Sequence, residues 1–156
     1  MKIIFLDVDG VLNCTTDWSG PNDDGPATLD PVKCDMLARI VRETDAVVVL
    51  SSTWRLIPGR ALDKLTAWLL KRNVTIHSYT KDLTSELGHC MIRGYEIARW
   101  MQNNANQFPN PRFVILDDDD DINQNQLPFF VQTSMKTGLT PELADKAIAI
   151  LNQNND

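Results

Sequence analysis

Apolar and polar positions alternate along this chain in blocks that predict strands separated by helices. Continuous apolar runs at residues 2–6, 46–50 and 112–116 have the length and composition of strands buried on both faces. Shorter runs at residues 74–77 and 129–131 predict two further strands. Because the strands alternate with helices, they predict a central parallel sheet of about five strands with helices on both faces.

Apolar residues recur at helical spacing between the predicted strands. Four helices are predicted: one that begins at Asp30-Pro31, two over residues 59–72 and 93–104, and one from Thr140 onward. Residues 79–91 have no readable pattern. The whole pattern is that of an α/β, Rossmann-like, three-layer sandwich. It leaves no room for a separate cap domain, and residues 1–156 are expected to form one domain.

Composition narrows the classes of protein to which the chain can belong. Its 156 residues carry a net charge of −6, which argues against nucleic-acid binding driven mainly by the overall charge. A local basic patch is still compatible with this charge. No apolar run is long enough to span a membrane, and the N-terminus lacks the features of a signal peptide. The three cysteines have no metal-ligand spacing. A cytoplasmic protein with reduced thiols is expected.

Polar residues collect where three of the predicted strands end. Asp7, Asp9 and Gly10 follow the first strand, and Ser51-Ser52-Thr53 follow the second. Five consecutive aspartates, 117–121, follow the fourth. Because the carboxyl ends of parallel strands lie at one edge of a sheet, these carboxylates should converge and repel one another unless a cation lies between them. Hard oxygen ligands favour Mg²⁺.

The first group also has a spacing suited to phosphoryl chemistry. In a straight strand, Asp7 and Asp9 would point to the same face. One carboxylate can attack phosphorus while its neighbour protonates the leaving oxygen and then activates water. Gly10 allows a tight turn out of the sheet. Arg93, at the start of a predicted helix, can offset charge on a phosphoryl group or position the nucleophile.

These motifs, taken in order, resemble those of the haloacid dehalogenase superfamily. The segment Phe-Leu-Asp-Val-Asp-Gly-Val-Leu at residues 5–12 resembles the first motif, Ser51 the second, Arg93 the third, and Asp117-Asp118 the fourth. The resemblance covers nearly the whole chain. Ser-Ser-Thr-Trp-Arg and Arg-Gly-Tyr-Glu-Ile further resemble a capless branch that includes nucleic-acid repair domains and is similar to polynucleotide 3′-phosphatases.

The resemblance implies a magnesium-dependent phosphomonoester hydrolase that acts through an aspartyl-phosphate. It implies Asp7 as nucleophile and metal ligand, and Asp9 as general acid and base whose backbone carbonyl touches the metal. It further implies Arg93 as the basic residue and Asp118, with or without Asp117, as metal ligand. Phosphate would be bound by Ser51, and we also expect Ser52 and Gly10 to contribute. The five aspartates leave the ligand register open, with Asp119 and Asp120 the expected solvated members.

Several alternatives remain open at the level of sequence. Trp54 and Arg55 could stack on a base or sugar, or could serve as core packing and a structural ion pair. Ser52 could be an ordinary turn hydroxyl, and Arg93 a surface ion-pair partner. An open site suits a large phosphorylated substrate such as a polynucleotide end. A small-metabolite phosphatase, a mutase and a non-catalytic binding module are the competing functions, although the Asp7/Asp9 pair disfavours the last.

Overall fold

Five parallel strands form the centre of the molecule. The computed structural model describes residues 1–14, 29–56, 60–87 and 92–153. The strands are β1 (Lys2–Leu6), β2 (Val47–Leu50), β3 (Ile76–Tyr79), β4 (Arg112–Asp117) and β5 (Phe130–Gln132). Their order across the sheet is β3-β2-β1-β4-β5, and every neighbouring pair is parallel. The expected α/β class with a five-stranded parallel sheet is therefore confirmed.

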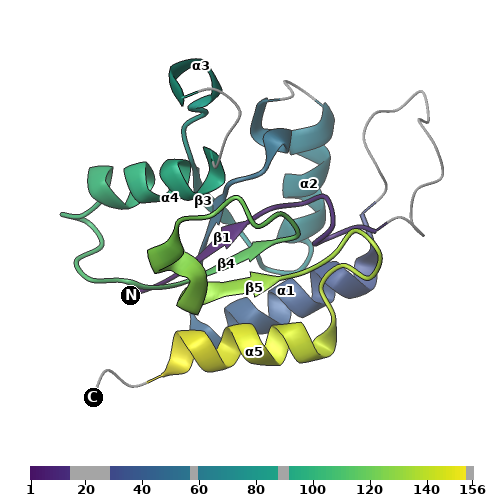
Figure 1. Cartoon of the computed structure of the whole chain (residues 1–156). Coiled ribbons are helices and arrows are strands. Elements are labelled where there is room, and N and C mark those ends of the chain that lie inside the picture. The colour runs from purple at the N-terminus through teal and green to yellow at the C-terminus, as the bar shows by residue number, and fades with distance from the viewer. Residues whose placement is uncertain (15–28, 57–59, 88–91, 154–156) are drawn as a thin grey trace.

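Helices connect the strands and cover the sheet on both sides (Figure 1). They are α1 (Pro31–Thr44), α2 (Arg60–Leu70), α3 (Thr84–Leu87), α4 (Ile92–Asn103) and α5 (Pro141–Asn152), with 3-10 turns η2 (Thr53–Leu56) and η3 (Gln124–Phe129). The unreadable stretch 79–91 holds the end of β3 and the short helix α3, and residues 88–91 lie outside the described part. No described helix has the length and apolar composition needed to cross a bilayer.

The third and fifth strands lie further along the chain than expected. Asn73 has a left-handed backbone with φ of 58°, which ends the turn after α2. The N–H of Val74 donates to the carbonyl of Leu69 in α2, so Val74 closes that helix and β3 begins only at Ile76. Phe129 belongs to η3, and β5 therefore begins at Phe130. Backbone hydrogen bonds to the preceding elements thus displaced both strands by one or two residues.

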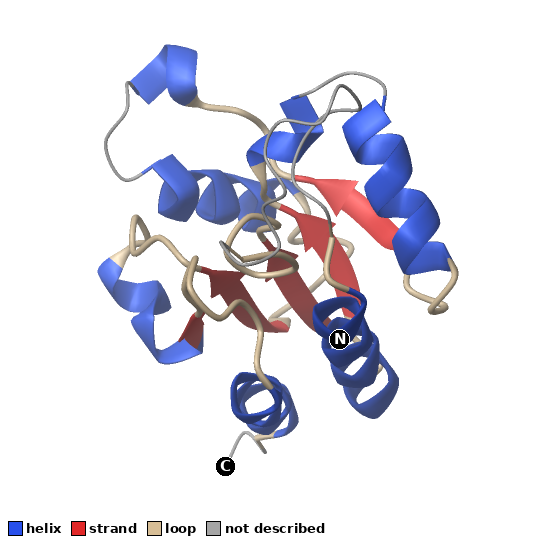
Figure 2. Cartoon of the chain, turned by 90° about the vertical axis from the view of Figure 1, so that its right-hand side faces the viewer, coloured by secondary structure: helices blue, strands red, loops and turns tan. Residues whose placement is uncertain are grey.

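Side chains alternate between the two faces of the sheet and create two separate cores. Ile4, Leu6, Val48, Leu50, Val114 and Leu116 pack with α1, α2 and α5 on one face. Ile3, Phe5, Val49 and Ile115 pack with α4 and the aromatic residues Trp100 and Phe108 on the other. The strands stand between these two layers of helices (Figure 2). This period of two fixes which face each residue at a strand end points to.

Caps identified in the sequence begin two of the helices. The Asp30 carboxylate accepts a hydrogen bond from the Val32 N–H at 2.7 Å, and proline occupies the first turn of α1. The Thr140 hydroxyl accepts from the Leu143 N–H at 3.4 Å at the start of α5. Both caps satisfy N–H groups that have no partner within the helix. Apolar side chains of α1 and α5 pack against one face of the sheet.

Candidate active site

The central strand places Asp7 between two neighbouring strand ends. Backbone hydrogen bonds continue one residue past β1, since the Asp7 N–H donates to the Leu116 carbonyl at 2.9 Å and the Ser51 N–H donates to the Leu6 carbonyl at 2.8 Å. This register aligns Asp7 with Ser51 on one side and Asp117 on the other. As predicted, the candidate residues meet at the carboxyl edge of the sheet.

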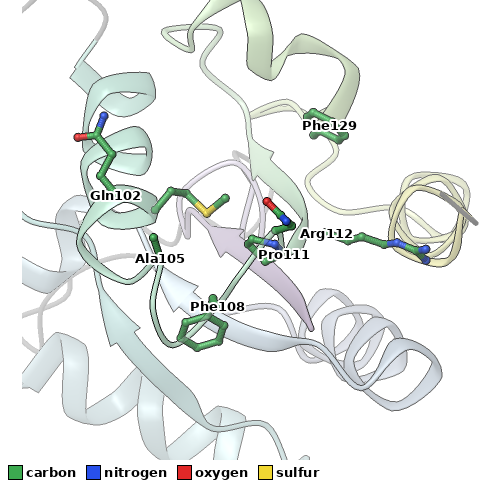
Figure 3. A pocket seen from close by; sticks show the side chains of 8 residues that line it. Gln102, Ala105, Phe108, Pro111, Arg112 and Phe129 are labelled. Carbon is green, nitrogen blue, oxygen red and sulfur yellow. The ribbon is translucent and has the colours of Figure 1, made fainter.

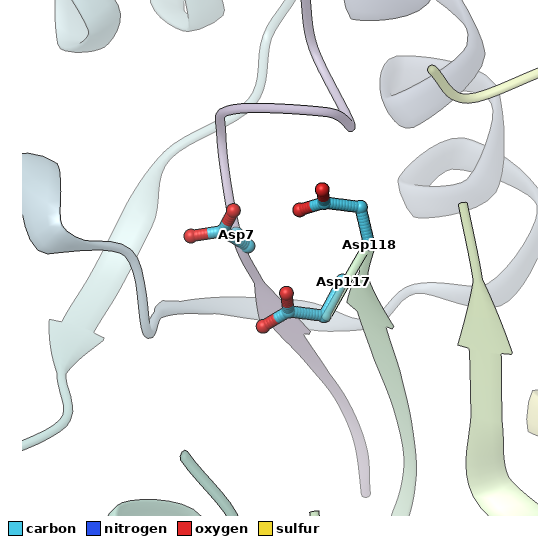
Figure 4. Close-up of side chains that lie close together, drawn as sticks. All are labelled: Asp7, Asp117 and Asp118. Carbon is cyan, nitrogen blue, oxygen red and sulfur yellow. The ribbon is translucent and has the colours of Figure 1, made fainter. Parts of the chain in front are cut away.

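Three carboxylates lie together at this edge (Figure 4). One oxygen from each of Asp7, Asp117 and Asp118 lies within 4.8 Å of the others. Burial raises the pKa of Asp7 to about 6. Burial, followed by the negative charge of Asp7, raises the pKa of Asp117 to about 8. A site that holds several carboxylates so close together suits a divalent cation with oxygen ligands, so the donor set fits Mg²⁺.

The five consecutive aspartates differ in their burial and in their hydrogen-bond partners. Asp117 is buried, and its two oxygens accept from Arg93 Nε and from the Asp119 N–H. Asp118 forms no side-chain hydrogen bond or ion pair with another described residue, which leaves its carboxylate available to a metal. Asp119 and Asp120 are exposed, as expected. Asp121 accepts from the backbone N–H groups of residues 93 and 94 through its carboxylate and its carbonyl, and thereby caps α4.

Arg93 extends from the first turn of α4 into the carboxylate cluster. Its Nε lies 2.9 Å from Asp117 Oδ2, and its Nη2 lies 3.4 Å from Asp7 Oδ1. Burial alone lowers the pKa of Arg93, but the charges of Asp117 and Asp7 outweigh it and the pKa is raised. The guanidinium therefore remains charged beside the candidate nucleophile. Its side chain is largely buried, so the alternative of a surface ion pair is wrong.

A buried ion pair between Arg55 and Glu96 lies next to Arg93. Arg55 Nη2 lies 2.7 Å from Glu96 Oε2, and both side chains are at most 5% exposed. Glu96 Oε2 also lies 3.5 Å from Arg93 Nη1. The Arg55 guanidinium further donates to the carbonyls of Ser51, Ser52 and Thr80. Arg55 is thus a structural ion-pair partner that joins the tips of β2 and β3 to α4.

Sequence reasoning assigned no role to Glu96. Glu96 follows Arg93 by three residues, and this spacing places two side chains on the same face of a helix. A carboxylate one helical turn after a candidate site arginine was therefore the feature of the sequence that could have pointed to Glu96. The pairing of Glu96 with Arg55, 41 positions earlier, had no local signature.

The two serines after β2 differ in their surroundings. Both are fully buried. The Ser51 hydroxyl has no hydrogen-bond partner among the described residues. A buried hydroxyl without a partner costs free energy unless a ligand supplies one, which fits an oxygen of a bound phosphoryl group. Ser52 accepts from the Trp54 N–H at 3.3 Å, and it lies close enough to Asp7 to lower the pKa of that carboxyl.

Asp9 lies in a tight turn that begins after β1. The N–H groups of Val11 and Leu12 both donate to the Val8 carbonyl, so the chain leaves the extended conformation before Asp9. β1 therefore does not continue as a straight strand to Asp9, and a shared face for Asp7 and Asp9 stays a prediction. The Asp9 carboxylate lies outside the three-carboxylate cluster and accepts from Trp54 Nε1 at 2.9 Å and from Asn13 Nδ2 at 2.8 Å. A metal contact through its carbonyl stays a prediction.

Gly10 makes the close approach of two loops possible. Its backbone has φ of 72°, and a Cβ built there would lie 2.5 Å from Asp118 Cγ. The Gly10 N–H donates to Asn13 Oδ1 at 3.0 Å, so this donor is already engaged. Phosphate binding by Gly10 stays a prediction, while the expected tight turn is confirmed, and Gly10 adopts a left-handed backbone in it.

Aromatic and basic residues on the rim of the site differ in their exposure. Trp54 is 1% exposed, and Arg55 is buried in its ion pair, so neither presents a surface on which a base could stack. Trp18 and the Arg60 side chain lie outside the described residues. Tyr79, at the end of β3, is 46% exposed. The Lys81 side chain is 64% exposed and pairs with Glu86.

Two hollows differ in their relation to the site. A hollow of about 240 Å³ adjoins Arg93 and is lined by Thr53, Leu56, Asp82, Thr84, Glu96, Asp119 and Asp121. A larger one of about 590 Å³ is lined by Phe108, Arg112, Phe129 and other residues (Figure 3). Arg112 is the first residue of β4, so the larger hollow lies at the amino edge of the sheet, opposite the carboxylates. Only the smaller one is placed to hold part of a substrate.

Comparison with known families agrees with this geometry. A family described as "HAD domain in Swiss Army Knife RNA repair proteins" matches residues 3–144, from β1 into α5. Searches of curated proteins and of solved structures found no match. A HAD domain suggests a phosphatase-type hydrolase. HAD domains generally depend on Mg²⁺, and the three-carboxylate cluster could hold such an ion. The chain belongs to the haloacid dehalogenase superfamily, in the family of HAD domains found in Swiss Army Knife RNA repair proteins.

Proposed function

We propose that this protein is a magnesium-dependent phosphomonoester hydrolase that forms an aspartyl-phosphate on Asp7. The observation that carries the proposal is the meeting of Asp7 with two further carboxylates and the Arg93 guanidinium at one strand edge. Asp7 supplies the nucleophile, and Arg93 supplies a fixed positive charge beside it. A binding module would need no buried nucleophile of this kind. The raised pKa values of Asp7 and Asp117 are typical of functional sites, where buried carboxylates lie close together.

The proposed reaction has two steps. Asp7 attacks phosphorus while Arg93 and the Ser51 hydroxyl bind phosphoryl oxygens, and Asp9 donates a proton to the departing alcohol. Asp9 then takes a proton from the water that attacks the aspartyl-phosphate, which releases inorganic phosphate and restores the Asp7 carboxylate. Mg²⁺ held by Asp7, Asp117 and Asp118 would offset negative charge on the phosphoryl group.

The substrate we favour is a phosphorylated RNA end. The family description names RNA repair proteins, and the described residues form no second domain over the site. Tyr79 and Lys81 are exposed near the carboxyl edge and could contact a base and a backbone phosphate. One observation favours the alternative of a small-metabolite phosphatase: the hollow beside Arg93 is small and is lined by Asp82, Asp119 and Asp121, which would repel additional phosphates.

The test of the chemistry replaces the nucleophile and keeps its shape. Asp7→Asn should lower phosphatase turnover at least about a thousandfold and leave the fold intact, because an amide cannot form the acyl phosphate. Asp120→Asn is the matched control, since it neutralises an exposed aspartate at the same edge of the sheet. Excess chelator should abolish wild-type turnover, and added Mg²⁺ should restore it. Near-normal turnover by Asp7→Asn would refute the mechanism.

The test of the substrate compares oligonucleotides with their components. An RNA oligonucleotide with a terminal phosphate should be hydrolysed with higher kcat/KM than the matching mononucleotide, and Tyr79→Ala should reduce that ratio. If nucleotides or sugar phosphates are better substrates by about tenfold or more, about 1.4 kcal/mol of transition-state stabilisation, the small-metabolite alternative replaces the RNA end.

A further inference from the structure

The carboxylate of Asp9 is held by two donors that reach it from different segments. Trp54 Nε1, in η2, lies 2.9 Å from Asp9 Oδ2. Asn13 Nδ2, at the end of the turn after β1, lies 2.8 Å from Asp9 Oδ1. Each carboxylate oxygen therefore accepts one N–H donor from a neutral side chain. This arrangement belongs to no part of the nucleophile or metal site described above.

Both donors are fixed in place. Trp54 and Asn13 are each 1% exposed. The Trp54 ring packs within the core shared by α1, α2 and α5. Asn13 Oδ1 accepts from the Gly10 N–H at 3.0 Å, and because a backbone N–H can only donate, the Asn13 amide must present its NH₂ group to Asp9. Neither side chain can reorient without the loss of buried contacts.

We propose that Trp54 and Asn13 are positioning residues that fix where the proton of Asp9 is carried. This inference rests on the proposed phosphatase activity. The indole N–H and the amide NH₂ are donors only, so a proton on Asp9 cannot lie on the lone pairs that face them. It must lie on a remaining lone pair of the carboxyl group. The two donors thus reduce the ways in which Asp9 can present its proton to the leaving oxygen.

The step that depends on this orientation is proton transfer to the leaving group. As the bond between phosphorus and the ester oxygen breaks, its electron pair goes to that oxygen, and the Asp9 proton neutralises it. An alkyl alcohol is a strongly basic leaving group and needs the proton, whereas 4-nitrophenolate leaves without it. A misoriented Asp9 should therefore lower kcat/KM selectively for alkyl esters, because kcat/KM covers the steps up to departure of the alcohol and not the hydrolysis of the aspartyl-phosphate that both substrates share. A loss of folding would impair both classes alike.

The test uses Trp54→Phe, which keeps an aromatic ring and removes the N–H donor. We expect kcat/KM for an alkyl phosphate such as a 3′-phosphorylated oligoribonucleotide to fall about tenfold or more, and that for 4-nitrophenyl phosphate to change less than about threefold. Asp9→Asn should show the same pattern with a larger effect. Trp100→Phe is the matched control, because the Trp100 indole donates to Ser78 Oγ at 3.0 Å and takes no part in the site. It should lower both values equally or not at all.

A measurement without turnover separates this proposal from the proposed function. In ¹H–¹⁵N spectra, Asp9→Ala should shift the Trp54 indole signal and accelerate its exchange with solvent, while the Trp100 signal stays unchanged. Equal losses for both substrates in Trp54→Phe, or an unchanged Trp54 indole signal in Asp9→Ala, would overturn the inference. If the wild type hydrolyses no phosphate ester but the indole signal responds as expected, the contact stands and the proposed function fails.

Discussion

Gly10 illustrates how closely two loops approach each other at the site. Asp118 directly follows the fourth strand and Gly10 lies in the turn after the first, and the Asp118 side chain occupies the space that a Cβ at position 10 would fill. The positive φ of Gly10 adds a second reason for glycine, since other residues rarely adopt it. A side chain here would strain the backbone and displace a proposed metal ligand.

We predict that Gly10→Ala raises the Mg²⁺ concentration required for half-maximal activity about tenfold or more, because Asp118 must move away from the cluster. The measurement is a titration of phosphatase activity with Mg²⁺. Gly138→Ala is a matched control: Gly138 also has a positive φ, of 62°, and its Cβ would meet the Lys33 side chain instead. Both variants should lose stability. An equal rise in the Mg²⁺ requirement of both would contradict the prediction.

Residue identity and strand position were sufficient to predict the charged centre of the site. Asp7, Ser51, Arg93 and Asp118 each follow an apolar run or begin a helix, so parallel topology brings them together. The contacts of Trp54 with Asp9 and of Arg55 with Glu96 join positions 45 and 41 residues apart, and no local pattern encodes them. Trp54 and Arg55 therefore remained open between substrate contact and a structural role at the level of sequence, and the structure buries both.

At the scale of elements, the turn η2 and the helix α4 are joined by one buried ion pair. Arg55 in η2 and Glu96 in α4 have few other ways to satisfy their charges, since both are removed from solvent. Burial lowers the pKa of Arg55. Removal of one partner leaves the other charge buried and uncompensated, which costs more than the pair itself contributes.

We predict that Glu96→Gln lowers the free energy of unfolding by about 3 kcal/mol or more, and that the double variant Arg55→Met/Glu96→Leu is less destabilised than the sum of its single variants. Chemical denaturation measures these values. Glu43→Gln, which removes a partner of Arg39 on the exposed face of α1, should cost less than about 0.5 kcal/mol. Similar costs for the buried and the exposed pair would show that burial plays no part.

Element boundaries were predicted less well than element order. The sequence pattern placed β3 at residues 74–77 because Val74 is apolar, whereas its N–H is used to end α2. The pattern also placed the start of β5 one residue too early, because the apolar Phe129 is the last residue of η3. Periodicity records which residues are buried but not which hydrogen bonds their backbones form. The order of the five strands and the four longer helices follows from burial, and it was predicted correctly, whereas the short helix α3 was not predicted.

At the scale of the whole molecule, the carboxylate cluster links stability to pH. The folded protein holds protons on Asp7 and Asp117 up to about pH 6 and about pH 8, whereas these groups have the ordinary pKa of 3.8 when unfolded. Between pH 3.8 and about pH 8 the folded state binds more protons than the unfolded state, so the free energy of unfolding falls as pH rises through this range. The pKa values of Asp82, Glu86 and Glu142 are lowered, and these surface acids titrate below this range.

We predict that the Tm of the protein in chelator falls by about 4 °C or more between pH 5 and pH 8, and that Mg²⁺ removes most of this decrease by binding the ionised carboxylates. Thermal unfolding followed by circular dichroism provides the measurement. Asp117→Asn should show a smaller decrease, because an amide does not titrate. A Tm in chelator that rises steadily over this range would contradict the pKa shifts.

The position of β1 at the centre of the sheet also governs when the site can assemble. β1 leaves the ribosome before the other four strands of this sheet, yet one of its two neighbours, β4, begins more than a hundred residues later. Until β4 pairs with it, one edge of β1 carries unpaired backbone groups, and such an edge readily pairs with other chains. The nascent protein therefore exposes an apolar strand until β4 has been made. We expect chains that end before β4 to aggregate, and catalytic competence to arise only after β4 and Asp118 have been synthesised.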